Sequence, residues 1–71
     1  MTNGNKRPAT WEEILQAALR KEKAAYRFYD EMLSATRIPI LRDLLETLRG
    51  EEAKHMDMIQ KRIAAMNLER S

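Results

Sequence analysis

The stretch Glu51-Glu52-Ala53-Lys54-His55 places a carboxylate and an imidazole three residues apart in a chain of 71 residues. On a helix, residues at this spacing lie on one face, so Glu52 and His55 can point at one target. Apolar residues extend this face at helical spacing, with Leu41, Leu45 and Leu48 before the stretch and Ile59, Ile63 and Met66 after it. Burying an ionised group in such an apolar helix face costs free energy unless the group has a partner. This helix face, called the seam below, therefore predicts a binding partner for Glu52 and His55.

The residues around this stretch predict two helices joined by a short turn. Thr10 and Glu13 form a capping box, so we expect the first helix over about residues 11–36. Pro39 disfavours helical geometry at Ile38 and suits the first turn of a new helix. The turn is therefore expected at about 36–38 and the second helix at about 39–67. We expect residues 1–9 to form a flexible lead-in, residues 10–68 a helical hairpin, and residues 69–71 a tail.

Glu22 interrupts an apolar stripe on the first predicted helix. The stripe has a period of about 3.6 residues, and its members are Leu15, Ala18, Leu19, Ala25, Tyr26, Tyr29, Met32 and Leu33. Glu22 lies fifteen residues before Arg37, and Glu52 lies fifteen residues after it. Equal arms with a rise of about 1.5 Å per residue put the two carboxylates at one level of an antiparallel hairpin. His55 lies within one helical turn of that level.

Gly50 is the one glycine inside either predicted helix. Glycine costs about 1 kcal/mol relative to alanine in a helix interior. Its presence therefore indicates either a close approach of another backbone beside the seam or a surface position that tolerates glycine.

A single hairpin leaves an apolar stripe uncovered and one side of the three polar residues open to water. Two chains paired as a four-helix bundle remove both deficits. The pair also brings together four glutamates and two histidines. Two helices that each give a Glu, and two that each give Glu-x-x-His, form the ligand set of di-iron and di-manganese carboxylate bundles. The predicted fold is therefore all-α, a two-helix antiparallel hairpin that dimerises into a four-helix bundle.

Two stretches of this sequence resemble metal-binding helices of the ferritin-like superfamily. The segment from Ile14 to Glu22, followed by Phe28-Tyr29, is similar to the opening helix of rubrerythrin-like members. The segment from Pro39 to His55 is similar to their second helix. One half-bundle per chain resembles the encapsulated ferritins, in which a similar aromatic-Tyr-Asp element follows the metal-binding Glu. The resemblance covers about Trp11 to Asn67 and implies a ferritin-like four-helix bundle.

The resemblance implies a ferroxidase-type oxidoreductase that oxidises Fe(II) to Fe(III) with O2 or peroxide, in iron storage or detoxification. The implied di-iron site lies between two chains, with Glu22, Glu52 and His55 as its metal-binding and catalytic residues. Tyr26 and Tyr29 follow Glu22 on its face, which predicts either a supporting role beside the carboxylates or ordinary core packing. Iron is the expected metal, and manganese and zinc stay open because cellular availability helps to decide between them.

Two other functions stay open at the level of the sequence. A non-catalytic helical dimer would use the same three ligands to carry a metal or to hold a structural one. A metal-free helical interaction module would use the polar residues of the seam to set register and partner. The sequence contains no cysteine, which excludes disulfides and thiolate-held zinc or iron.

The charge pattern and the hydropathy of the sequence argue against nucleic-acid and membrane partners. The net charge is +2, but basic and acidic residues alternate along both predicted helices, so we expect no nucleic-acid partner. No window approaches the roughly 18 apolar residues of a membrane span, and no apolar segment of a secretory signal follows Met1. We therefore expect no membrane partner and a cytoplasmic protein. A homodimer is the minimum assembly, a higher oligomer stays open, and the resemblance adds an encapsulin-type shell as a candidate partner and location.

Overall fold

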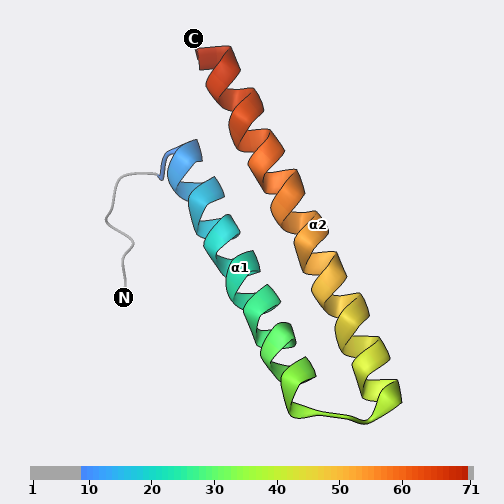
Figure 1. Ribbon diagram of the computed structural model, residues 1–71. Helices are drawn as coiled ribbons and strands as arrows, with labels where there is room; N and C mark the ends of the chain where they lie inside the picture. Colours follow the sequence, from blue (N-terminus) through green and yellow to red (C-terminus); the bar gives the residue numbers. More distant parts are fainter. Residues whose placement is uncertain (1–8, 71) are drawn as a thin grey trace, which may run out of the picture.

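The computed structural model describes residues 9–70, which form two α-helices and the segment that joins them (Figure 1). Helix α1 spans Trp11–Ala35 and helix α2 spans Pro39–Arg70. The helices run antiparallel and side by side, and α2 extends past the start of α1 (Figure 1). The predicted all-α hairpin is confirmed, while its pairing with a second chain stays a prediction. Neither helix, within the residues described, is long and apolar enough to cross a membrane.

Helix α1 begins with the expected capping box. The Glu13 N–H donates to Thr10 Oγ1 at 3.1 Å, and the Thr10 N–H donates to Glu13 Oε1 at 3.0 Å. These bonds satisfy two of the backbone donors that a helix start leaves unpaired. Glu12 and Glu13 also place negative charge at the positive end of the helix dipole. The start of α1 is therefore determined by its own local sequence.

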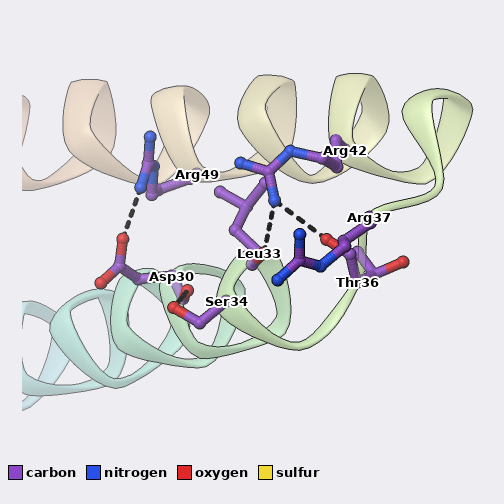
Figure 2. Close-up of a pocket in the computed structure, with 7 residues that line it drawn as sticks. All are labelled: Asp30, Leu33, Ser34, Thr36, Arg37, Arg42 and Arg49. Atoms are coloured by element: carbon purple, nitrogen blue, oxygen red, sulfur yellow. Dashed lines mark hydrogen bonds and ion pairs between the residues drawn. The ribbon is translucent and has the colours of Figure 1, made fainter.

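The turn at residues 36–38 is held mainly by α2. Helix α1 has no basic residue in its last turn, although its last carbonyls lack partners within the helix. Arg42 of α2 supplies the missing donors, because its Nη1 donates to the Leu33 carbonyl at 2.5 Å and to the Thr36 carbonyl at 3.0 Å (Figure 2). The Ile38 N–H donates to Thr36 Oγ1 at 3.2 Å. Arg42 thus caps α1 and ties the two helices together at the turn.

The helix bounds differ slightly from those expected. Helix α1 ends at Ala35, and α2 ends at Arg70, three residues beyond the expected 67. No glycine or proline follows Asn67, and leucine, glutamate and arginine are good helix formers, so the helix continues where a tail was expected. Residues 1–8 of the expected lead-in, and Ser71 of the expected tail, lie outside the described residues.

The single hairpin buries few side chains. Among the described hydrophobic residues, Leu19 and Leu33 alone are buried, with exposed fractions of 7% and 5%. Large apolar side chains that stay exposed are Ile14, Phe28, Met32, Ile38, Ile40, Leu41, Leu44, Met58 and Leu68. A chain of this size needs most of its apolar surface in a core to be stable. The described hairpin by itself therefore encloses only a small core.

Helical geometry gathers many of the exposed apolar side chains on one side of the hairpin. Successive residues are rotated by about 100° around the helix axis, so the angular position of each residue can be measured from Glu22 in α1 and from Glu52 in α2. When two helices run antiparallel, residues that are rotated from these references in the same sense lie on the same side of the pair. This side, called the apolar face below, carries Ile14, Phe28, Met32, Leu41, Leu44 and Met58. The opposite side, called the polar face, carries Lys23, Arg27, Asp30, Glu46 and Asp57.

Gly50 occupies a surface position. It is exposed, and no atom counted among residues 9–70 lies within 4 Å of a Cβ built on it. By the same count it lies about 160° from Glu52, away from the seam. Of the two alternatives that the sequence left open, the single chain shows the tolerated surface glycine.

Candidate metal centre

Glu22, Glu52 and His55 converge between the two helices. One ligand atom from each lies within 4.8 Å of the other two. His55 Nδ1 is 3.4 Å from Glu22 Oε1 and 3.5 Å from Glu52 Oε1. The structure thus brings together, within one chain, the three residues that the sequence singled out. Their role as metal ligands stays a prediction.

Helix geometry explains the convergence. Glu52 and His55 are three residues apart on α2 and share one face of that helix. Glu22 meets them from α1 because both arms of the hairpin have the same length, counted from Arg37. The Arg42 cap holds the turn end of both arms, which sets the level at which the two carboxylates meet.

Burial differs among the three side chains. The exposed fractions are 26% for Glu22, 18% for Glu52 and 51% for His55. Glu52 Oε1 is buried and has no hydrogen-bond partner among the described residues. A buried polar atom without a partner is rare in native structures and calls for an explanation. A carboxylate oxygen that lacks a donor, beside a second carboxylate and an imidazole, fits a bound cation.

The two carboxyl groups also shift each other's pKa in opposite directions. The neighbouring Glu52 carboxyl lowers the pKa of Glu22, burial opposes this, and nearby His55 lowers the pKa further. The neighbouring Glu22 carboxyl, together with burial, raises the pKa of Glu52, against a smaller lowering by His55. Two close carboxylates resist holding two negative charges, so Glu52 keeps its proton to a higher pH than an isolated carboxyl does when no metal is present. A cation can replace that proton.

The donor set suits a particular group of metals. Carboxylate oxygens with one imidazole nitrogen fit iron, manganese or zinc, whereas soft ions prefer sulfur ligands. One chain offers three such side chains, and half of the His55 side chain is exposed. His55 lies about 60° from Glu52 toward the apolar face. The open side of the centre is therefore the side on which the uncovered apolar residues lie.

Tyr26 and Tyr29 make their contacts away from the carboxylates. The Arg49 guanidinium lies over the Tyr26 ring, 5.9 Å from its centroid. The Tyr29 ring packs edge to face against Phe28, with centroids 5.4 Å apart and planes at 70°. Both tyrosines are half-buried. A supporting role beside the metal stays a prediction for these residues.

Two arginines of α2 that organise the hairpin were not anticipated from the sequence. Arg42 caps α1, and Arg49 forms an ion pair with Asp30 across the helices (Figure 2). A signal for Arg42 exists in the sequence. The equal-arm count about Arg37 places it opposite the last turn of α1, where basic residues bind free carbonyls and where α1 itself has none.

The fold and the site together define a class: a helical hairpin that carries two glutamates and a histidine at one level, the residue types that carboxylate four-helix bundles use as metal ligands. A family model described as Rubrerythrin matches residues 13–71. The match includes all three candidate ligands and nearly all of both helices, and the chain belongs to the rubrerythrin family. The expected relation to rubrerythrin-like proteins is thereby confirmed, whereas a closer relation to encapsulated ferritins stays a prediction. Comparisons with curated proteins and with solved structures give no significant match.

Proposed function

We propose that two copies of this chain pair through their apolar faces and form a di-iron carboxylate centre that oxidises Fe(II) to Fe(III). The observation that carries this proposal is the convergence of Glu22, Glu52 and His55 to within 4.8 Å beside an uncovered apolar face. Membership of the rubrerythrin family supports iron as the metal.

Pairing of two chains accounts for the exposed apolar side chains and for the open side of the metal centre. A second hairpin on the apolar face would cover the exposed apolar side chains and close the open side of His55. It would also double the ligand set to four carboxylates and two imidazoles, which suffices for two metal ions. A standard interface buries about 800 Å² on each partner. The apolar residues run along the length of both helices, so they can form the centre of an interface of that size.

In this proposal Fe(II) is the substrate, and electrons balance through the oxidant. Two Fe(II) ions each lose one electron, and O2 with two protons becomes H2O2. With peroxide as the oxidant, two Fe(II) ions, H2O2 and two protons give two Fe(III) ions and two water molecules. The Fe(III) product is then stored or removed from solution, which protects the cell from free Fe(II).

The side chains have separate tasks in this reaction. Glu22 and Glu52 attract Fe(II) by charge, and metal binding displaces the proton that the raised pKa of Glu52 retains at lower pH. Their anionic oxygens favour the more highly charged Fe(III) product because the attraction grows with the charge of the ion. His55 adds one neutral nitrogen donor per chain. The surrounding apolar face keeps bulk water away from the centre once two chains pair.

Oxygen uptake by metal-free protein on addition of Fe(II) tests the proposed activity. We expect uptake with the wild-type chain, and we expect Glu22→Gln or His55→Ala to slow it at least tenfold, about the effect of losing an interaction worth 1.4 kcal/mol. Glu46→Gln is the matched control because Glu46 is exposed on the polar face, away from the centre and from the proposed interface. Iron binding without oxygen uptake would instead support a non-catalytic metal-binding dimer. Absence of iron binding would leave a helical interaction module.

A further inference from the structure

A cavity of about 550 Å³ lies at the turn end of the hairpin and is lined by the side chains of three arginines (Figure 2). Arg37 comes from the turn, and Arg42 and Arg49 come from α2. Asp30 is the one acidic residue of the lining, which leaves two positive charges in excess. We propose that this cavity binds a small multivalent oxyanion of the phosphate class.

Two of the arginines are held in place by the fold. Arg42 uses Nη1 for two carbonyls of the α1 terminus, and Arg49 uses Nη1 for the Asp30 carboxylate. Each guanidinium carries five N–H donors, so both retain donors for a ligand. Their side chains are ordered before a ligand arrives, which lowers the entropic cost of binding.

Arg37 is the uncommitted member of the three. It is exposed and makes no hydrogen bond or ion pair within the described part of the chain, yet it lines the cavity with the other two. Figure 2 shows its side chain extended from the turn toward the same gap that Arg42 enters. Thr36 adds a hydroxyl, which accepts from the Ile38 N–H and keeps its own proton to donate. Arg37 and Thr36 are therefore available to a ligand.

The chemistry of the lining selects an oxyanion. A planar guanidinium fork matches the oxygens of phosphate or carboxylate with paired, charge-assisted hydrogen bonds. An excess of two positive charges favours a dianion such as hydrogen phosphate over chloride or a metal cation. The volume lies within the range of about 300–1,000 Å³ that small-ligand sites occupy. Inorganic phosphate and a small phosphate monoester share this chemistry.

The cavity is separate from the metal centre and from the proposed dimer face. Asp30, Arg42 and Arg49 lie about 60–80° from Glu22 or Glu52 toward the polar face, whereas the apolar face lies on the other side. Asp30 is also eight residues from Glu22, a distance of about 12 Å along α1. The cavity would therefore stay open after two hairpins pair, and its ligand does not depend on the proposed oxidation.

Titration of inorganic phosphate into the metal-free, full-length chain at constant ionic strength, followed by calorimetry and by amide NMR shifts, tests this site. We expect saturable binding, with shifts concentrated at residues 30–42 and around Arg49. Arg37→Gln should weaken binding roughly tenfold or more, the effect of losing a hydrogen bond to a charged group. Arg27→Gln, which removes an exposed arginine outside the cavity, should leave binding unchanged.

Two further experiments identify the preferred ligand and test whether the cavity binds it independently of the metal centre. Glycerol 3-phosphate replaces inorganic phosphate in a second titration, and the tighter of the two shows whether the free ion or a monoester is preferred. Glu22→Gln should bind phosphate as the wild-type chain does, because the metal centre is not involved. Equal responses to phosphate and to chloride at matched ionic strength would overturn the proposal. Unchanged phosphate affinity in Arg37→Gln would overturn it as well.

Discussion

Glu52 is the residue at which stability and the proposed function conflict most directly. Its Oε1 is buried and has no hydrogen-bond donor in the described part of the chain, and its neighbour Glu22 is a second carboxylate. Functional sites commonly contain such unfavourable groups, and replacing them often stabilises a protein while it abolishes activity.

The substitution Glu52→Gln separates these two effects. In metal-free protein we expect a higher thermal midpoint, because the change removes the repulsion and its amide can donate to Glu22. Metal affinity should fall about 10- to 100-fold or more, since loss of even an outer partner of a metal site has an effect of this size. Thermal melts with and without Mn(II) measure both effects. A lower midpoint without metal, or an unchanged rise on adding Mn(II), would contradict this reading.

The opposite pKa shifts of the two glutamates predict how stability changes with pH in metal-free protein. The pKa of Glu52 is raised, so its contribution is complete below the ordinary carboxyl range, near pH 4.3, and is lost as the pH rises through the folded-state pKa. The pKa of Glu22 is lowered, so its contribution is complete above that range and is lost as the pH falls through its folded-state value.

Urea unfolding at a series of pH values across this range measures how much Glu52 and Glu22 each contribute to stability. Relative to Glu52→Gln, the wild-type chain should lose stability as the pH rises above about 4.3. Metal binding should strengthen over the same interval because the ion competes with the proton on Glu52. A constant difference between the two proteins at every pH would show that Glu52 titrates normally.

At the scale of the element, the Arg42 cap determines how α1 meets α2. Removing it by Arg42→Ala leaves two carbonyls at the end of α1 without their donor. We expect a loss of about 1.5–3 kcal/mol in the free energy of unfolding, the usual value for hydrogen bonds to a charged group. Metal affinity should also fall, because the Arg42 cap keeps Glu22 and Glu52 at the same level of the hairpin. Arg37→Gln is the control for stability, and an equal effect of both changes would contradict the assignment.

Replacing Gly50 with alanine should stabilise the protein if Gly50 is a surface position. The position is helical and exposed, and none of the described residues places an atom within 4 Å of an added Cβ. Gly50→Ala should therefore raise the free energy of unfolding by up to about 1 kcal/mol, because alanine loses less backbone entropy than glycine in a helix. Urea unfolding of the two proteins measures the difference. A destabilised variant would reveal a close approach to Gly50 that the single chain does not contain.

The sequence predicted the two helices and the convergence of Glu22, Glu52 and His55, because both depend on short-range periodicity. The capping box and Pro39 place the helix starts, and equal arms place Glu22 level with Glu52. Arg42 and Arg49 were missed because a long side chain can reach across helices from many positions, which periodicity does not record. The end of α2 was missed because a helix without a stop signal continues as far as its propensity allows.

At the scale of the whole molecule, the hairpin has more apolar surface exposed than it has core. Leu19 and Leu33 are the buried hydrophobic residues of the described chain, whereas the apolar face runs along both helices. An uncovered face of this extent is the surface that the proposed pairing would cover. A second copy is the partner that would also complete the metal ligands. The apolar pattern predicts the uncovered face, while the geometry of pairing depends on contacts between chains that one chain does not contain.

Native mass spectrometry of the Fe(II)-loaded chain under anaerobic conditions tests the central claim most directly, because it counts chains and metal ions in the same particle. A shared centre predicts dimers, or assemblies of dimers, that carry two iron ions per pair of chains, and it predicts that Glu22→Gln loses both ions. Monomers that each hold one iron ion, or dimers that hold none, would contradict the claim that two chains share the centre.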